Sequence, residues 1–171
     1  MKKHNLKAGP SILPQEVIKK AAEAIIDFEG TGLSLIEISH RSKEFVAVME
    51  EARTLVKKLM NLGDDFEVLF LQGGASLQFA MVPYNFLKEG GKAAYLDTGS
   101  WAANALKEAK KVGQIDVVGS SKEEKYSFIP KDYTLTEDYD YFHLTSNNTI
   151  YGTQIKEFPQ TNIPLVCDMS S

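Results

Sequence analysis

The sequence predicts an α/β fold with three layers, α/β/α, in which a mostly parallel sheet lies between helices. Three observations support this prediction: short apolar runs alternate with helical stretches, glycine-containing turns separate them, and the 171 residues include 43% hydrophobic ones, enough for the core of one globular domain. No domain boundary is evident within the chain. Active sites in such sheets lie at the carboxyl ends of the strands.

Two amphipathic helices are expected in the first third of the chain. After Pro14, apolar residues recur at helical spacing until Gly30 interrupts them. After the polar stretch 39–42, a longer helix carries apolar residues on one face over 45–59 and stops near Gly63. The other face of this second helix is charged.

The middle of the chain predicts two units in which a strand leads through a turn into a helix. The apolar run 68–71 precedes a glycine pair and a helix over 75–87, and the run 93–96 precedes a helix over about 100–111. The polar segment 120–138 is expected to be a surface connection. Further short apolar runs predict strands at 115–118, 141–144 and 165–167.

Composition narrows the classes of function. The net charge is −4, with Lys, Asp and Glu mixed along the chain, so there is no basic field of the kind that nucleic-acid binding uses. The single cysteine, Cys167, has no internal disulfide partner, and one cysteine with three scattered histidines forms no recognisable metal site. The start of the chain has no signal-peptide pattern, and no stretch approaches the ~20 apolar residues that span a bilayer. We therefore expect a cytoplasmic protein that binds neither nucleic acid nor a membrane.

A candidate phosphate site follows the first predicted strand. Gly73, Gly74, Ala75 and Ser76 open a helix there, and the free backbone N–H groups of a helix start suit a phosphate. Small residues let the phosphate approach closely. An ordinary tight turn capped by Ser76 is an equally open alternative.

Three other strand ends carry groups that could surround a flat ligand. Trp101, the only tryptophan, lies in the first turn of a predicted helix and could stack on an aromatic ring, although a core or interface role is also open. The polar run 145–152, which includes Thr149, offers hydrogen-bond donors and acceptors, or marks a turn only. Asp168 directly follows the apolar run 165–167, where a carboxylate is costly unless it is exposed or has a charged partner. A helix cap is the alternative for Asp168.

A phosphate site, a stacking ring, hydroxyl donors and a carboxylate together describe a pocket for a flat, phosphorylated, cationic heteroaromatic molecule. Pyridoxal 5'-phosphate is such a molecule. Its ring nitrogen needs an anionic partner to stay protonated and act as an electron sink, and Asp168 could be that partner.

The positions of the arginines and histidines are informative because arginine is scarce, with two against 17 lysines. Arg53 lies among the charged residues of a helix and is expected to be solvated. Arg41 lies beside His40 before a helix, where its guanidinium could clamp a carboxylate or phosphate, although a simple surface role is also open. His4 and His143 have no partners at suggestive spacing, and we expect them to be structural or exposed.

A series of ordered motifs runs through nearly the whole chain. They are NLKAGPSILP at 5–14, ISHRSKEF at 38–45, FLQGGASLQF at 70–79, TGSW at 98–101, SNNTIYG at 146–152 and CDMSS at 167–171. Through these motifs the sequence resembles the phosphoserine aminotransferases, which are class-V, fold type I pyridoxal-phosphate enzymes. The resemblance implies the large domain of that fold, in incomplete form.

The resemblance also implies a role for each candidate cofactor residue. Ala75 and Ser76 would bind the cofactor phosphate. Trp101 would stack on the pyridine ring, Thr149 would hydrogen-bond near the ring, and Asp168 would pair with the ring nitrogen. Some members of the family carry arginine at the position of Ser76, so anion binding here would rely more on other groups.

For the substrate, the resemblance implies that His40 and Arg41 receive the acidic side-chain group, either the glutamate carboxylate or the substrate phosphate. The implied reaction moves an amino group from glutamate to 3-phosphohydroxypyruvate in serine biosynthesis. A related phosphorylated substrate on the pyridoxine route is a second possibility.

The resemblance further implies a homodimer and a division of the chain. Residues 1–14 would join the small domain of the enzyme, and residues 15–171 would form the cofactor-binding large domain, truncated at its C-terminal end. The Schiff-base lysine of the family would lie beyond Ser171, in the remaining C-terminal part of the enzyme. We therefore expect the 171 residues alone to be inactive.

Two other interpretations stay open. One is a non-enzymatic α/β domain that binds a phosphate or nucleotide at residues 73–76, against which stand the absence of a dinucleotide glycine pattern and of a phosphate-loop lysine. The other is a different fold type I pyridoxal-phosphate enzyme, for which the His40–Arg41 pair is the discriminating feature.

Overall fold

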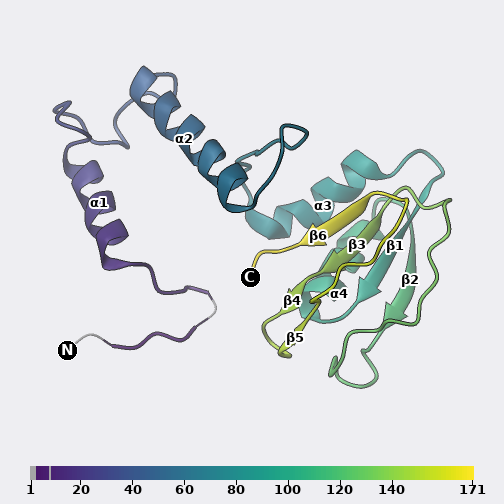
Figure 1. Cartoon of the computed structure of the whole chain (residues 1–171). Coiled ribbons are helices and arrows are strands. Elements are labelled where there is room, and N and C mark those ends of the chain that lie inside the picture. The colour runs from purple at the N-terminus through teal and green to yellow at the C-terminus, as the bar shows by residue number, and fades with distance from the viewer. Residues whose placement is uncertain (1–2, 8) are drawn as a thin grey trace. The chain divides into compact units, whose positions relative to one another are not determined.

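The computed structural model describes residues 3–7 and 9–171 and separates into two compact units, Met1–Leu71 and Gln72–Ser171 (Figure 1). Two helices characterise the first unit, and a parallel sheet with two helices forms the second. The predicted domain boundary lies between residues 14 and 15, whereas the two compact units meet between Leu71 and Gln72. The predicted boundary stays a prediction.

The first unit contains the two predicted helices, α1 (Gln15–Ile26) and α2 (Lys43–Leu59). The α2 helix begins at Ser42, whose side chain accepts a hydrogen bond from the backbone N–H of Phe45 at 3.2 Å. Lys57 and Lys58 lie in its last turn, where positive charge is favourable. Neither helix has a fully buried residue within the part of the chain that the structure describes, so their apolar faces remain largely exposed.

The second unit contains a four-stranded sheet in the order β2-β1-β3-β6, and every neighbouring pair in it is parallel (Figure 1). This confirms the predicted α/β class and the predicted strands and helices from residue 74 onward. The elements are α3 (Gly74–Phe86), β1 (Lys92–Asp97), α4 (Ser100–Ala109), β2 (Gln114–Ser120), β3 (Phe142–Thr145), β4 (Asn147–Asn148), β5 (Thr153–Gln154) and β6 (Leu165–Asp168).

The predicted strand at 68–71 is wrong. No ladder involves these residues within the described chain, and their apolar side chains are largely exposed, with Leu69 at 70% and Leu71 at 55%. A strand exists only where a neighbour takes its backbone hydrogen bonds, and an apolar run by itself does not supply that neighbour.

The two faces of the sheet pack against different partners. On one face, Ala93 and Tyr95 of β1 pack with Phe79 of α3 and with Ala105 and Ala109 of α4. The small alanine side chains let α4 approach the strands closely, so the helices form a layer on this face.

The opposite face packs against the connecting segments. Leu96, Phe142 and Leu144 form its core, and Ile129 and Tyr133 of the segment 120–138 pack on them. The predicted surface connection is therefore also the cover of this face of the sheet.

A β-bulge interrupts the pairing of β1 with β2. Tyr95 pairs with Val117, but the next residue, Leu96, pairs with Gly119, so Val118 is an extra residue in the β2 strand. Beyond this irregularity Asp97 pairs with Ser120.

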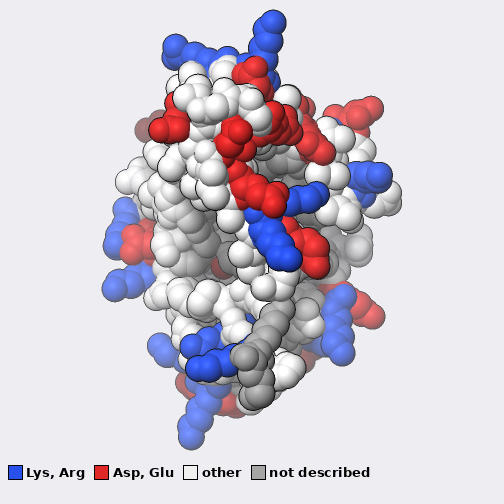
Figure 2. All heavy atoms as spheres, turned by 90° about the vertical axis from the view of Figure 1, so that its left-hand side faces the viewer, with Lys and Arg blue, Asp and Glu red and all other residues white. Residues whose placement is uncertain are grey.

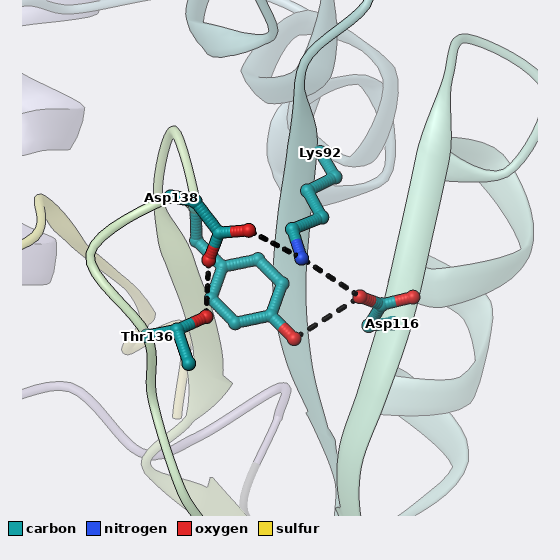
Figure 3. Close-up of polar contacts among 5 residues, drawn as sticks. Lys92, Asp116, Thr136 and Asp138 are labelled. Carbon is teal, nitrogen blue, oxygen red and sulfur yellow. Dashed lines mark hydrogen bonds and ion pairs between the residues drawn. The ribbon is translucent and has the colours of Figure 1, made fainter.

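Near the amino ends of the strands, a polar cluster ties β1 to its neighbours (Figure 3). The ammonium of Lys92 lies 2.7 Å from Asp138 and 3.8 Å from Asp116, and 4.5 Å above the ring of Tyr139. Tyr139 donates to Asp116 at 3.0 Å, and Thr136 donates to Asp138. The hydrogen bond to Asp138 raises the pKa of Lys92 and lowers that of Asp138.

The surface carries charges of both signs. Figure 2 shows basic and acidic side chains interspersed over the face turned to the viewer, as the modest net charge of −4 indicates. Among the described helices, none combines the length and the apolar character that a membrane span requires.

Candidate functional site

Three neighbouring strands end side by side at the carboxyl edge of the sheet. Tyr95 of β1 pairs with His143 of β3, and His143 pairs with Val166 of β6. Two residues later, Thr145 pairs with Asp168. Because side chains alternate along a strand, His143, Val166 and Asp168 share one face of the sheet, the face that the helices cover.

A cavity of about 340 Å³ opens at this edge. The start of α3 contributes Ala75 and Gln78, β3 contributes His143, and the end of β6 contributes Asp168 followed by Met169. The structure therefore brings together Ala75 and Asp168, two of the residues that the sequence nominated for one ligand, although they are far apart along the chain.

The start of α3 has the geometry of an anion site. Gly73 precedes the helix at φ 91°, and a Cβ atom there would lie 2.3 Å from Leu77 Cδ2, so only glycine fits. No side chain caps this start and no acidic residue lies in the first turn of this 13-residue helix. Ala75 is half-buried and Ser76 is exposed. The alternative in which Ser76 caps an ordinary turn is not observed, and the backbone N–H groups have no side-chain acceptor among the described residues.

Asp168 is held by the residues that follow it. Its Oδ1 atom accepts hydrogen bonds from the backbone N–H of Ser170 at 3.0 Å and from the Ser170 hydroxyl at 2.5 Å. The side chain is half-buried and lines the cavity. With Oδ1 fixed in this way, Oδ2 has no hydrogen-bond partner within the described chain and is available to a cationic group.

His143 lies beneath the cavity and is only 3% exposed. Its ring stacks on that of Tyr95, with centroids 4.6 Å apart and planes 12° apart, and the Tyr95 hydroxyl shares a 2.8 Å hydrogen bond with Tyr141. Burial lowers the pKa of His143 to about 4, although Asp168 acts in the opposite direction, so the imidazole is neutral near pH ~7.

His143 is not among the site residues that the sequence indicates. The signal that would have found it is register, because His143 lies two residues before the end of a strand whose parallel neighbour ends at Asp168. Of the two expected alternatives, structural or exposed, the structure excludes the exposed one, because His143 is buried.

Trp101 and Thr149 lie on neighbouring segments of the same edge. Trp101 is in the first turn of α4 and is 43% exposed, and Thr149 is exposed in the turn after β4. The two segments are joined by side chains that sequence reasoning missed. Asn148 donates to the Thr98 hydroxyl at 3.3 Å, and the Tyr151 and Ser100 hydroxyls lie 2.9 Å apart.

The antiparallel pair β4–β5, which the sequence did not predict, holds Asn148 in place. Asn148 pairs with Thr153 and is 1% exposed. A Cβ atom at Gly99 would lie 2.4 Å from Asn148 Oδ1, so the close approach of this hairpin to the start of α4 depends on glycine.

Asp97 closes β1 with a buried carboxylate whose Oδ2 atom is bonded within the fold. It accepts from the Ser120 hydroxyl at 3.0 Å and from the Tyr126 hydroxyl at 3.5 Å. Burial, assisted by Asp97, raises the pKa of Tyr126 to about 12. The Oδ1 atom of Asp97 is buried and has no hydrogen-bond partner among the described residues.

His40 and Arg41 lie in the first unit, in the turn before α2, and both are exposed. The backbone N–H of Arg41 donates to the Ser39 hydroxyl at 3.2 Å, which shapes this turn. Their predicted role in substrate binding stays a prediction. Across the described residues no group of His, Cys, Asp and Glu side chains is arranged to hold a metal ion.

A parallel α/β sheet with an uncapped helix start and a carboxylate on one cavity at its carboxyl edge is typical of ligand-binding α/β proteins, and comparison with known proteins identifies the family. The family model described as aminotransferase class-V matches residues 4–171. The chain belongs to this family.

Individual relatives are more specific. A phosphoserine aminotransferase from Flavobacterium psychrophilum is 66% identical over all of this chain and 48% of its own length. The structure of phosphoserine aminotransferase from Bacillus circulans subsp. alkalophilus is 46% identical, with a TM-score of 0.91 over 95% of this chain and 46% of that one. The PLP-bound phosphoserine aminotransferase from Trichomonas vaginalis is 32% identical, with a TM-score of 0.87 over 97% of this chain and 47% of that one. The chain thus spans about half the length of the curated relatives it matches.

Proposed function

We propose that this chain is the cofactor-binding part of a phosphoserine aminotransferase, and that the cofactor is pyridoxal 5'-phosphate. The observation that carries the proposal is the placement of Ala75 and Asp168 on one cavity at the carboxyl edge of the sheet. Relatives of 55–66% identity that bear this enzyme's name support it.

The residues of the cavity fit the cofactor chemically. The uncapped start of α3 offers backbone N–H groups to a phosphate beside the small Ala75, with Ser76 as a hydroxyl donor. The free Oδ2 of Asp168 offers a negative charge to a protonated ring nitrogen. Pyridoxal phosphate, when bound, supplies an electron sink for the bonds at the α carbon of an amino acid.

Trp101 and Thr149 complete the proposed cofactor site. The exposed indole of Trp101 would stack on the ring, and the hydroxyl of Thr149 would donate to a ring substituent. The contacts of Asn148 and Tyr151 with the start of α4 hold these two segments against each other.

His40 and Arg41 are proposed to bind the acidic group of the substrate. Both side chains are exposed, and the guanidinium of Arg41 can make the two-point contact that a carboxylate or phosphate requires. The proposed reaction transfers the amino group of glutamate to 3-phosphohydroxypyruvate in serine biosynthesis, with the related pyridoxine-route substrate as a second acceptor. A homodimer in the cytoplasm, and a small domain that includes residues 1–14, belong to the same proposal.

The cofactor assignment is tested by titrating the full-length apoprotein with pyridoxal phosphate and following the absorbance of the bound form. Asp168→Ala is expected to weaken binding by about tenfold or more, because the ring nitrogen loses its anionic partner. Asp138→Ala, which removes a carboxylate near the opposite edge of the sheet, is the matched control and is expected to bind normally. Absence of a cofactor band in the unmodified protein would favour the alternative of a non-enzymatic phosphate-binding domain.

The substrate assignment is tested separately by comparing amino donors. Phosphoserine is expected to be a far better donor than alanine, and Arg41→Lys is expected to raise KM for phosphoserine more than it lowers kcat. Equal use of alanine and phosphoserine would indicate another fold type I aminotransferase.

A further inference from the structure

His143 is a buried polar side chain that the proposed cofactor contacts leave unused. It is 3% exposed, it lines the same cavity as Asp168, and its Nδ1 atom has no hydrogen-bond partner among the described residues. Buried polar atoms are normally paired, so an unpaired one that lies beside a ligand cavity needs a functional explanation.

The sheet register fixes where His143 lies relative to Asp168. His143 pairs with Val166, and Asp168 is two residues further along the same strand, so the two side chains project from the same face as diagonal neighbours. The Ser170 hydrogen bonds occupy only the Oδ1 atom of Asp168. The other side of the carboxylate is therefore open to a second contact.

The orientation of the imidazole is fixed from below. Tyr95 stacks on it at 4.6 Å, and the hydroxyl of Tyr95 is in turn held by Tyr141 at 2.8 Å. A ring that is stacked, buried and backed by a hydrogen-bonded pair cannot easily turn away from the cavity.

We propose that His143 is a positioning residue for Asp168, which it orients toward the ring nitrogen of the bound cofactor. This inference rests on the proposed function of the same site. Because burial keeps the imidazole uncharged, His143 can donate a hydrogen bond to the carboxylate without neutralising it. A cationic histidine would instead compete with the ring nitrogen for the charge of Asp168.

The test compares two ligands on the full-length apoprotein, namely pyridoxal phosphate and an analogue with carbon in place of the ring nitrogen. His143→Phe keeps the flat stacked ring and removes both nitrogens. It is expected to raise the Kd of pyridoxal phosphate by about tenfold and to leave that of the analogue within about twofold. His143→Gln, which restores a hydrogen-bonding group, is expected to recover much of the loss.

Tyr139→Phe is the control, because it removes a hydroxyl that donates to Asp116 near the amino ends of the strands, away from His143. Its cofactor affinity is expected to be unchanged. Equal weakening of both ligands by His143→Phe would mean a merely structural role, and an unchanged Kd would mean no role. Either result overturns the inference, while pyridoxal phosphate binding by the unmodified protein would still support the proposed function.

A second measurement needs no variant. With isotope-labelled histidine in the unmodified protein, the ring nitrogen resonances of His143 are expected to shift when pyridoxal phosphate binds and to stay in place with inorganic phosphate alone. No shift with the cofactor would overturn the inference even if His143→Phe did not fold.

Discussion

A Cβ atom on Gly99 would lie 2.4 Å from Asn148 Oδ1, so these two residues set how closely the hairpin after β3 approaches the start of α4. The φ angle of Gly99 is 166°, which any residue adopts, so the requirement for glycine comes from the contact and not from the backbone. Thr149 and Trp101, the proposed ring contacts, lie on the two segments that meet here.

Gly99→Ala is therefore expected to displace Asn148 and to lower the free energy of unfolding by about 1–3 kcal/mol, as overpacking of a close contact does. Denaturant unfolding of the full-length protein measures the change. Gly113→Ala is the control, because an added Cβ there would meet only the flexible end of Leu87 at 3.0 Å. If both variants lost the same free energy, the contact with Asn148 would not be the cause.

The turn before α3 gives a second prediction. Gly73→Ala is expected to cost more stability than Gly74→Ala, since Gly73 combines φ 91° with an approach of 2.3 Å to Leu77, whereas Gly74 at φ 60° has open space around its Cα. The cost at Gly74 is expected to be about 1–2 kcal/mol, from the left-handed backbone alone. Thermal unfolding of the two full-length variants ranks them, and the reverse order would contradict the geometry.

The buried hydroxyl pair of Tyr95 and Tyr141 predicts a non-additive double-mutant cycle. Each single change to Phe leaves one buried hydroxyl without its partner and is expected to cost about 1–2 kcal/mol, whereas the double change removes both groups and is expected to cost less than the sum. Denaturant unfolding of the four proteins gives the coupling energy. Strict additivity would show that the 2.8 Å contact contributes nothing.

The pH dependence of stability follows from His143. Burial lowers its pKa in the folded protein to about 4, and Asp168 and Tyr95 are the titratable groups that face it. In the unfolded chain an imidazole titrates near its ordinary value of about 6.5. Between these two pKa values the unfolded state binds more protons than the folded state. The contribution of neutral His143 to the free energy of unfolding is therefore fully present above pH ~6.5 and is lost as the pH falls toward ~4.

Unfolding measured at several pH values is expected to show a decrease of up to about 3 kcal/mol from this group over that range. His143→Phe lacks the titrating ring, so its free energy of unfolding is expected to fall less steeply with acid. Identical slopes for the two proteins would contradict a buried neutral His143.

Much of the fold could be predicted from the sequence, because amphipathic spacing identifies helices such as 15–26 and short apolar runs identify buried strands such as 93–96. The run 68–71 has the same apolar character but no ladder partner in the described chain, and periodicity carries no information about partners. The β4–β5 hairpin was missed because its residues are polar and its strands have two residues each.

The candidate site was only partly predictable, because the sequence pattern does not show which strands are neighbours. Ala75 and Asp168 were found because they follow strands or open helices, and both line the cavity. His143 lies inside a strand, where a single histidine looks like a core residue until the register with β6 is known. Asn148 was hidden in a polar run, since its importance comes from contacts with Thr98 and Gly99, about 50 residues away.

The extra residue Val118 in β2 determines which residue stands opposite Asp97 at the sheet edge. With uninterrupted pairing, Asp97 would stand opposite Gly119 and would have no side-chain hydroxyl across the ladder. The insertion advances β2 by one position, so that Asp97 meets Ser120 and receives its hydroxyl at 3.0 Å. A one-residue irregularity on the neighbouring strand thus supplies a hydroxyl donor to the Oδ2 atom of Asp97 at the sheet edge where β6 presents Asp168 to the cavity.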